Sequence, residues 1–337
     1  MTEKHEQPAP VVALIGMLTG GFLPRAIQVA ARLGLGHILR KGSANVAELA
    51  RKTGSDPIAL AKVLRLLAEN DIVLELEDGS FGPTPLSDQL HLVDHPLFGE
   101  EDWQAWGGLM DAVRTGKPAF ESVHGASVYQ TIVRDPAREA NWNEWNTVTA
   151  ASWLPSLIDA LHLSGTERVV DVGGGQGTLL VEILNRFPGC QGILLDLASV
   201  VVSAPAILQQ HGVSGRCKVT AGDAFVSVPP GGDAYTLCRI LFNWDRKKRV
   251  QLLRNCRAAM RPGSRLCVVE MVMPEKGDPM RKRLAGIDLD IWLTWGSNIP
   301  TLSEWESLFT DSGFSLVRVS EPPTTALPWR VLEGSPK

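Results

Sequence analysis

The chain has 337 residues, 44% of them hydrophobic, and a formal net charge of −4. This length suggests more than one domain, and the composition is that of an ordinary soluble globular protein. The acidic balance argues against a nucleic-acid partner, which would usually require a basic surface. Residues 1–10 show no signal-peptide pattern, and no apolar stretch approaches the ~20 residues of a membrane span.

Five cysteines are scattered along the chain without any C-x-x-C pair. We therefore expect reduced thiols, a cytoplasmic location and no structural zinc. The basic run Arg246-Lys247-Lys248-Arg249 is short and isolated, and we interpret it as the solvated start of a helix.

The N-terminal region is predicted to be helical, after a tail formed by residues 1–10. Apolar residues recur at near-helical spacing as far as residue 68, and Asp56-Pro57 is a typical helix start. Residues 72–77 and 80–84, joined by the turn Asp78-Gly79, predict a small hairpin. Helices followed by a hairpin indicate a winged-helix unit, which we assign to residues 11–95.

Residues 96–163 are predicted to be a helical linker with pocket helices, and they are rich in tryptophan. The chain holds ten tryptophans but only two tyrosines. These indoles either fill the core between helices or form a flat wall for a planar ligand, and both interpretations stay open.

From residue 164 onward, apolar strands and helices alternate. This pattern predicts an α/β fold with a doubly wound parallel sheet, whose ligands bind at the carboxyl ends of the strands. The expected strands are 168–172, 192–195, 217–221, 234–239 and 265–270. Residues 314–319 and 329–332 would add an antiparallel hairpin.

A glycine-rich segment at residues 171–177 follows the first of these strands and opens a helix. Its G-x-G-x-G spacing differs from the G-x-G-x-x-G of dinucleotide sites, and the lysine of a phosphate-binding P-loop is missing. Asp171 directly precedes the glycines, where a carboxylate would repel a pyrophosphate but would suit a cationic amino-acid group. S-adenosylmethionine (SAM) has such a group and carries no phosphate.

Two more acidic residues end the next two predicted strands. Asp196 lies where a carboxylate can accept from the ribose hydroxyls of a nucleoside. Asp223 can accept from the adenine amino group while Phe225 packs on the ring, although Asp223 alone could equally be a helix cap. Three acidic positions at three successive strand ends favour SAM as the cofactor.

These motifs, with Met260-Arg261-Pro262-Gly263 and Val269-Glu270, resemble class I small-molecule O-methyltransferases that carry an N-terminal winged-helix dimerisation domain. The resemblance covers residues 12–333. It implies a Rossmann-like SAM-binding domain at 164–337 and an intertwined homodimer, in which Phe22 and Arg25 would reach the partner's pocket.

The resemblance and the motifs together give a set of expected site residues. Cofactor contacts are expected from Asp171, Gly173, Gly175, Asp196, Leu197, Gly222, Asp223, Ala224, Phe225 and Arg239. Contacts to an aromatic acceptor are expected from Trp106, Trp142, Asn146, Phe242, Asn243, Trp292 and Trp295. No metal is expected.

The chain departs from the family at its general base. Many members carry a histidine in a Leu-His-Asp-Trp-x-Asp segment, and here that position is Phe242, which cannot take a proton. Glu270 matches the acidic residue that orients the base, and residues 296–301 lack a second acidic residue. The candidate catalytic residues are Asn243, as a hydrogen-bond partner of the acceptor, Asp290, as a distant base or water anchor, and Glu270. His124 and His162 are the remaining candidates for proton transfer.

Several functions follow from this departure. Methyl transfer to an acidic phenol or a ring nitrogen needs no protein base, because holding an electrophilic methyl in line with the acceptor supplies much of the catalysis. Short matches resemble bacterial methyltransferases of phenazines and anthracyclines. The alternatives are N-methylation, a SAM-retaining hydroxylase or pericyclase, and a winged-helix regulator that senses the cofactor.

Overall fold

The computed structural model describes residues 9–93, 98–320 and 329–337. The chain divides into two compact units, residues 1–104 with 129–145 and residues 105–128 with 146–337. The sequence boundaries after residues 10, 95 and 163 stay predictions, and most of the expected tail lies outside the described residues.

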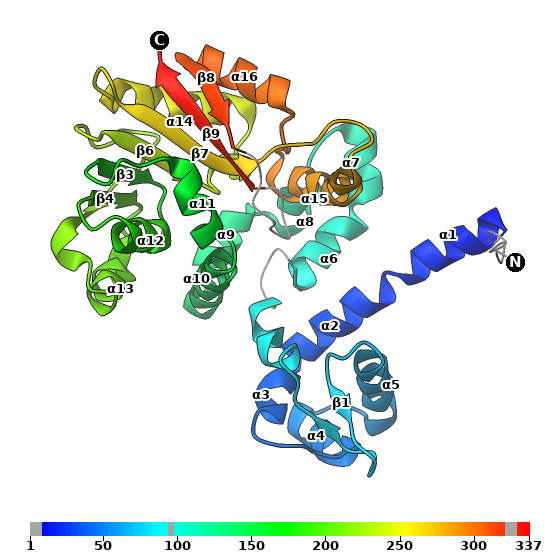
Figure 1. Ribbon diagram of the computed structural model, residues 1–337. Helices are drawn as coiled ribbons and strands as arrows, with labels where there is room; N and C mark the ends of the chain where they lie inside the picture. The colour runs from blue at the N-terminus through cyan, green and yellow to red at the C-terminus, as the bar shows by residue number, and fades with distance from the viewer. Residues whose placement is uncertain (1–8, 94–97, 321–328) are drawn as a thin grey trace, which may run out of the picture. The chain divides into compact units, whose positions relative to one another are not determined.

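The first unit is built mainly from short helices (Figure 1). Its elements are α1 (Pro10–Thr19), α2 (Phe22–Arg32), α3 (Leu35–Leu39), α4 (Val46–Thr53), α5 (Pro57–Ala68), β1 (Leu74–Glu75), β2 (Phe81–Gly82) and η1 (Ser87–Val93). Asp56 caps α5 by accepting from the backbone N–H of Ala59 at 2.8 Å, as the Asp-Pro start predicts. Leu35, Leu64 and Leu67 lie in its fully buried core.

The predicted hairpin is present but shorter than expected, because only two residues of each strand pair. Its turn is the expected one: Gly79 adopts a φ of +75°, and the Asp78 carboxylate accepts from the N–H of Ser80 at 2.9 Å. Phe81 also pairs with Ala44, which ties the hairpin to the segment just before the N-cap of α4.

Three helices, α6 (Glu100–Gly107), α9 (Val128–Val133) and α10 (Pro136–Ala151), contain the points where the chain passes from one unit to the other. The second unit contains a seven-stranded sheet in the order β5-β4-β3-β6-β7-β9-β8. Its strands are β3 (Arg168–Val172), β4 (Gln191–Asp196), β5 (Cys217–Ala221), β6 (Ala234–Cys238), β7 (Arg265–Met271), β8 (Phe314–Val319) and β9 (Trp329–Pro336). β3 to β7 pair in parallel, and β9 pairs antiparallel with both β7 and β8, which confirms the doubly wound fold predicted from the sequence.

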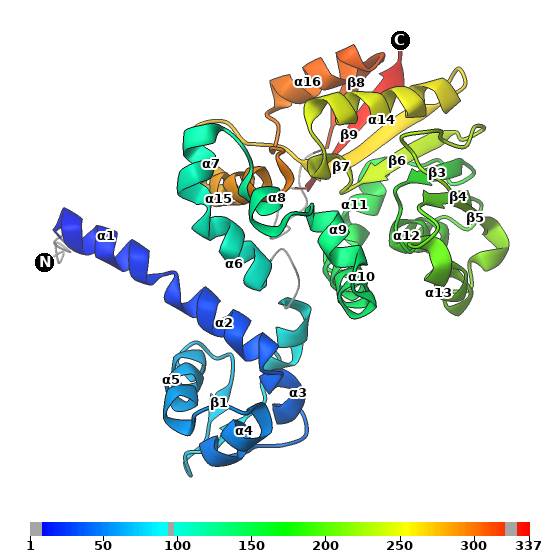
Figure 2. The same cartoon turned by 180° about the vertical axis from the view of Figure 1, so that it is seen from behind.

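Helices cover both faces of this sheet (Figures 1 and 2). One face packs against α11 (Leu154–Ile158), α12 (Thr178–Arg186), α13 (Ala204–Gln210) and α15 (Pro279–Trp295), and the other against α14 (Arg246–Ala259) and α16 (Leu302–Asp311). The remaining helices of this unit are α7 (Leu109–Thr115) and α8 (Ala119–His124). Alternation along β3 serves both cores, because Val169 faces one helical layer and Val170 the other.

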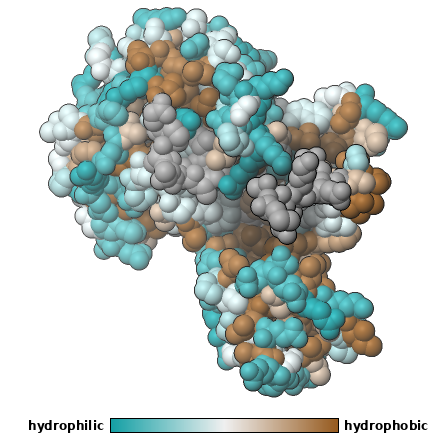
Figure 3. Space-filling view, turned by 45° about the vertical axis from the view of Figure 1, so that its right-hand side comes forward, coloured by the Kyte–Doolittle hydropathy of each residue, from teal (hydrophilic) through white to brown (hydrophobic). Residues whose placement is uncertain are grey.

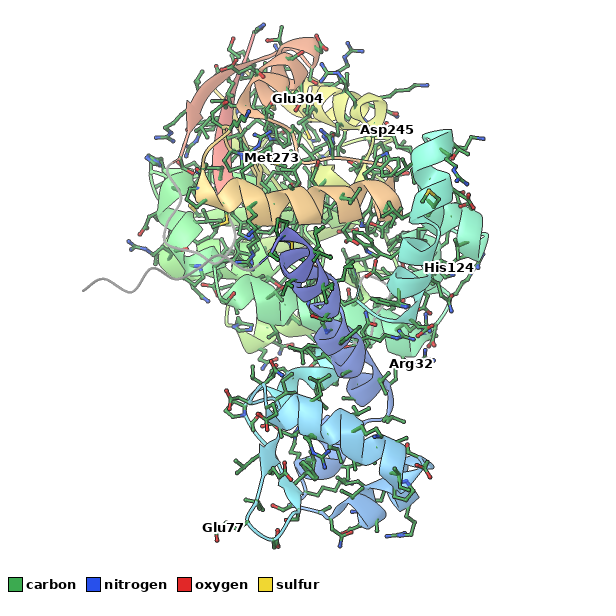
Figure 4. All side chains as sticks on the ribbon, turned by 90° about the vertical axis from the view of Figure 1, so that its right-hand side faces the viewer. Arg32, Glu77, His124, Asp245, Met273 and Glu304 are labelled. Carbon is green, nitrogen blue, oxygen red and sulfur yellow. The ribbon has the colours of Figure 1, made fainter. Side chains whose placement is uncertain are left out.

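The basic run 246–249 begins α14, as expected, and Asp245 caps it (Figure 4). The prediction that the whole run is solvated is wrong for Arg249, which is only 3% exposed. Helical spacing explains the difference, since Arg249 lies on the same face as the buried Leu252, Leu253 and Cys256.

Residues 10–32 form a helical run that is long and apolar enough, by length and composition alone, to cross a membrane. By this measure the prediction of no such stretch is wrong, because glycines and single polar residues interrupt the run while its most apolar 18-residue window still has a mean hydropathy of 1.5. Core helices of soluble proteins and signal sequences pass the same test. Hydrophobic residues reach the surface in several places (Figure 3), and Leu18 of α1 is 76% exposed.

The packing of α3 against η1 can be tested at Gly36. A Cβ there would lie 2.2 Å from the carbonyl oxygen of Ser87, a backbone atom that cannot move alone. We expect Gly36→Ala to lower the free energy of unfolding of the first unit by about 1–3 kcal/mol in urea denaturation. Gly286→Ala in α15 is the matched control, because nothing lies within 4 Å and alanine favours the helix. Equal stability of the two variants would contradict the packing.

Candidate functional site

The glycine-rich loop joins β3 to α12 at the carboxyl edge of the parallel sheet. Gly173, Gly175 and Gly177 all adopt a positive φ, between 62° and 90°, which side chains rarely tolerate. The N–H groups of Gly173 and Gly174 donate to the carbonyl of Leu195, at 2.8 and 3.2 Å. The loop is therefore held against the end of β4.

Asp171 lies beneath this loop and is fully buried. Its Oδ1 accepts from the hydroxyl of Thr236 at 2.8 Å, whereas Oδ2 has no hydrogen-bond partner among the described residues. Burial raises the pKa of Asp171 to about 7, the Thr236 hydroxyl opposes that rise, and the nearby Asp196 adds to it. An unpaired buried carboxylate oxygen is costly and suits a cationic ligand.

Gly174 packs directly against that carboxylate. A Cβ at this position would lie 2.4 Å from Asp171 Oδ2 and 2.5 Å from a methyl carbon of Leu194. Any side chain here would therefore cover the orphaned oxygen. The loop combines a bare backbone with a buried acceptor, which is the arrangement that a cationic nucleoside requires.

Asp196 ends β4 next to the same loop. Its Oδ2 accepts from the N–H of Gly175 at 2.8 Å, and its Oδ1 from the N–H of Leu197 at 2.7 Å. Burial raises the pKa of Asp196, and these two backbone donors oppose the rise. Each carboxylate oxygen keeps a second lone pair, so the group can still accept from two ribose hydroxyls.

Asp223 follows β5 and is tied into a local turn. Its carboxylate accepts from the N–H of Phe225 at 2.8 Å, which closes a turn; among the described residues no helix follows before β6, so the alternative interpretation as a helix cap is wrong. The N–H of Gly222 donates to the carbonyl of Asp196, and Asn255 of α14 donates to the carbonyl of Ala224 at 2.8 Å. Residues 222–225 are thereby fixed beside the end of β4.

Sequence reasoning left out Trp244, which the structure places beside Phe225. Their ring centroids lie 4.9 Å apart in an edge-to-face arrangement, and the ammonium of Lys248 lies 4.6 Å from the indole. The buried Nε1 of Trp244 has no hydrogen-bond partner among the described residues. The signal was available, because Trp244 belongs to the same short segment that carries the lost base.

Arg239 directly follows β6 and has a positive φ of 57°, which is unusual for a residue other than glycine. Its guanidinium carbon lies 5.8 Å from the ring of Trp153 and 5.5 Å from that of Trp329. Burial lowers the pKa of Arg239. The structure thus holds the guanidinium plane at the sheet edge, and the cofactor contact expected of it stays a prediction.

The expected acceptor residues of the second unit gather around α15. Trp295 lies edge-to-face with Phe242, with ring centroids 6.2 Å apart. Asp290 accepts from the indole N–H of Trp106 at 2.8 Å. Trp292 packs on the small cluster of Ala112, Ala119 and Leu293, together with Trp106.

Two other expected acceptor contacts lie near the boundary between the units. Trp142 belongs to the first unit and stacks on Trp145, with ring centroids 5.4 Å apart. Asn146 opens the adjoining part of the second unit, where its carbonyl accepts from the hydroxyl of Thr149. Their roles stay predictions.

The segment that lost the histidine is held by Glu270. Instead of contacting a histidine, Oε1 of Glu270 accepts from the backbone N–H groups of Leu241, at 2.8 Å, and Phe242, at 3.3 Å. Burial raises the pKa of Glu270 to about 7, and Arg249 with the two backbone donors opposes the rise. Glu270 therefore orients the backbone of residues 241–242. The buried Oδ1 of Asn243 has no hydrogen-bond partner among the described residues.

The two histidine candidates lie on different elements of the second unit. His162 lies in the loop before β3, at the opposite edge of the sheet from the glycine loop, and His124 ends α8, where it contacts the ring of Phe120. Within the described ranges, no group of three or more histidine, cysteine or acidic side chains could hold a metal ion.

The fold and the loop define a Rossmann-like class I methyltransferase. A family model for the O-methyltransferase domain matches residues 106–315, and the chain belongs to this family. The phenazine O-methyltransferase PhzM of Lysobacter antibioticus is 34% identical over 328 residues, which cover 95% of this chain and 96% of that protein.

Solved structures agree with this assignment. The crystal structure of LaPhzM superposes with a TM-score of 0.85 at 33% identity, covering 98% of this chain and all of that one. The S-adenosylhomocysteine-bound form of CalO1, a methyltransferase in calicheamicin biosynthesis, superposes with a TM-score of 0.77 at 32% identity, covering 99% of this chain and 100% of that one.

The family also contains other activities. A relative 31% identical over 86% of this chain is named as an 8-amino-8-demethylriboflavin N,N-dimethyltransferase of Streptomyces davaonensis. Another, 29% identical over 91% of the chain, is named as the aclacinomycin 10-hydroxylase RdmB of Streptomyces purpurascens. Family membership alone therefore does not fix the acceptor atom.

The pKa of Asp171 makes a prediction for ligand binding. A cationic cofactor needs the ionised carboxylate, so affinity for S-adenosylhomocysteine should rise as the pH increases through about 7. Asp171→Asn should weaken binding by about 10- to 100-fold at pH 8, the value of a hydrogen bond to a charged group.

Titration of the protein with S-adenosylhomocysteine, followed by tryptophan fluorescence at several values between about pH 6 and pH 8.5, measures both effects. This range spans about two pH units around the pKa of Asp171. Protonation of the ligand itself is common to both proteins, so the difference between their pH profiles isolates Asp171. A variant with the wild-type profile would contradict the role of this carboxylate.

Proposed function

We propose that this protein transfers the methyl group of SAM to a hydroxyl of a polycyclic aromatic secondary metabolite. A phenazine-like phenol or an N-hydroxy or N-oxide compound is the proposed acceptor class. The names of the relatives support this class, since they include phenazine and mitomycin O-methyltransferases. Five free cysteines support the proposed cytoplasmic location.

One observation carries the proposal: Phe242 and Asn243 combine an aromatic face with an unpaired acceptor at the position of the missing base. Phe242 meets Trp295, while the buried Oδ1 of Asn243 has no partner among the described residues. An aromatic ring would lie against the indole and phenyl faces, and its hydroxyl would donate to Asn243.

When bound, SAM supplies an electrophilic methyl on a sulfonium. Asp171, Asp196, Asp223 and Phe225 are proposed to hold the nucleoside and amino-acid parts, and Arg239 the carboxylate. The acceptor oxygen attacks the methyl carbon, the carbon–sulfur bond breaks, and the proton of the hydroxyl leaves to water. Fixing the reacting atoms in line supplies most of the rate enhancement, so an acidic hydroxyl needs no histidine.

We also propose a homodimer formed through the N-terminal unit. Val11, Leu14, Met17 and Leu18 of α1 are each at least 60% exposed, which is unusual for a helix of a monomer. Phe22 is 64% exposed, and Arg25 pairs with Glu100 at 2.6 Å within its own unit. A second copy would cover this apolar face, and Phe22 and Arg25 would border the partner's pocket.

The second candidate is methylation of a ring nitrogen in the same substrate class. The N-methyltransferases among the relatives support it, and a nitrogen lone pair needs no base. A third candidate keeps SAM bound as a charge for hydroxylation, as the relative named as a hydroxylase suggests. Analysis of the product separates the three.

The direct test is incubation with methyl-labelled SAM and a panel of hydroxylated phenazines and naphthoates. We expect S-adenosylhomocysteine and an O-methyl ether in equal amounts, unaffected by EDTA. Loss of activity in EDTA would show a metal requirement, and a converted acceptor without S-adenosylhomocysteine would exclude methyl transfer.

The role of Asn243 can be tested on the acceptor that this panel identifies. Asn243→Ala should lower kcat/KM by about tenfold, the value of one hydrogen bond to the reacting hydroxyl. Asn70→Ala, which removes an exposed amide at the end of α5, is the control and should have no effect. Unchanged kinetics for Asn243→Ala would remove this residue from the site.

A further inference from the structure

Two buried charges of opposite sign flank Leu241, directly before Phe242. Glu270 of β7 is 1% exposed and accepts from the N–H of Leu241 at 2.8 Å. Arg249 of α14 is 3% exposed and donates its Nε–H to the carbonyl of Leu241 at 2.9 Å. Both backbone groups of this one residue are therefore fixed by ionisable side chains.

The other nitrogens of Arg249 bind a second segment. They donate to the carbonyl of Asn298 at 2.7 Å, to its Oδ1 at 3.2 Å, and to the hydroxyl of Ser297. That hydroxyl donates in turn to the carbonyl of Trp244 at 2.8 Å. One guanidinium thus joins residues 241–244 to residues 297–298.

These two segments border the proposed acceptor pocket, which would be formed by Phe242, Asn243, Trp292 and Trp295. Residues 241–244 include Phe242 and Asn243. Residues 297–298 follow Gly296, the C-cap of α15, and this helix carries Trp292 and Trp295. Their surroundings are anchored as well, because Met273 pairs with Thr301 and Glu304 completes the cap of α16 (Figure 4).

Stability alone does not account for such an arrangement. Removing two charges from water is costly, and well-packed apolar side chains of similar volume are often equally or more stabilising. A guanidinium offers something that apolar groups lack, since its rigid fork of five donors can fix several acceptors in one geometry.

We propose that Arg249 is a positioning residue for methyl transfer. It fixes the Phe242–Asn243 segment relative to the end of α15 and so sets the distance between the two sides of the acceptor pocket. The kinetic part of this proposal rests on the proposed function, whereas the structural coupling does not. Burial lowers the pKa of Arg249, while the acidic groups Glu270, Glu304 and Asp245 oppose that decrease.

The coupling is tested by hydrogen–deuterium exchange of the full chain with S-adenosylhomocysteine present. Arg249→Lys keeps the charge but cannot bind both segments, so peptides containing residues 241–244 and 297–298 should both exchange at least about tenfold faster. Ser297→Ala should have the same effect on residues 241–244, in smaller degree. Faster exchange in only one segment, or in neither, would overturn the coupling.

The kinetic part uses methyl transfer to whichever hydroxylated phenazine or naphthoate turns over. Arg249→Lys should lower kcat by about tenfold while the dissociation constant of S-adenosylhomocysteine stays within about twofold, because positioning acts on the reacting atoms. A kcat within about twofold of wild type would overturn the positioning role. If no acceptor turns over, the proposed function fails, while the exchange result still decides the coupling.

Arg265→Lys is the matched control. Arg265 also bridges backbone carbonyls, those of Leu161 and His162, but at the start of β7, the opposite edge of the sheet. This variant should lower the melting temperature without changing kcat or the exchange of residues 241–244. If the decrease in kcat is proportional to the decrease in melting temperature in both variants, Arg249 has only a structural role and the proposal is wrong.

Discussion

The buried carboxylate of Asp171 is the constraint on which the rest of the site depends. One of its oxygens is paired with Thr236, while the other lies beneath Gly174 with no partner among the described residues. A low-dielectric site makes such an oxygen expensive, and a cation above the loop would relieve that cost. The absence of a side chain at Gly174 lets the loop pack directly against this oxygen, and Asp196 fixes the loop through Gly175.

The sheet gathers the remaining groups. Parallel strands bring the ends of β3, β4, β5 and β6 to one edge, so that residues far apart in sequence meet there. Asp196 links the loop to β4, Gly222 binds the carbonyl of Asp196, and Asn255 of α14 fixes the turn at Ala224. On the side proposed for the acceptor, α15 carries Asp290, Trp292 and Trp295, while Glu270 and Arg249 hold the segment that contains Phe242.

Much of this could be predicted from the sequence, because short-range patterns carry it. Strand alternation, the glycine spacing and the Asp56-Pro57 start each depend on a few neighbouring residues, and the structure has them nearly where expected. The hairpin is shorter than the sequence predicts. Its residue Phe81 also pairs with Ala44, which lies outside the local pattern.

The burial of Arg249 could not be predicted from the charge of its segment alone. A basic run indicates a solvated helix start, yet helical spacing places its fourth residue among Leu252, Leu253 and Cys256 on the buried face. Only the tertiary structure reveals that Leu241, Ser297 and Asn298 offer it acceptors. Likewise, no local pattern pairs Trp106 with Asp290, which are separated by 184 positions.

The central claim is that the loop at residues 171–177 is built for a cationic nucleoside without phosphate. Isothermal titration of the purified protein with SAM, S-adenosylhomocysteine and NAD tests it most directly. The account predicts saturable binding of the first two, one molecule per chain, and no binding of NAD. Binding of NAD, or the failure of both SAM and S-adenosylhomocysteine to bind, would contradict it.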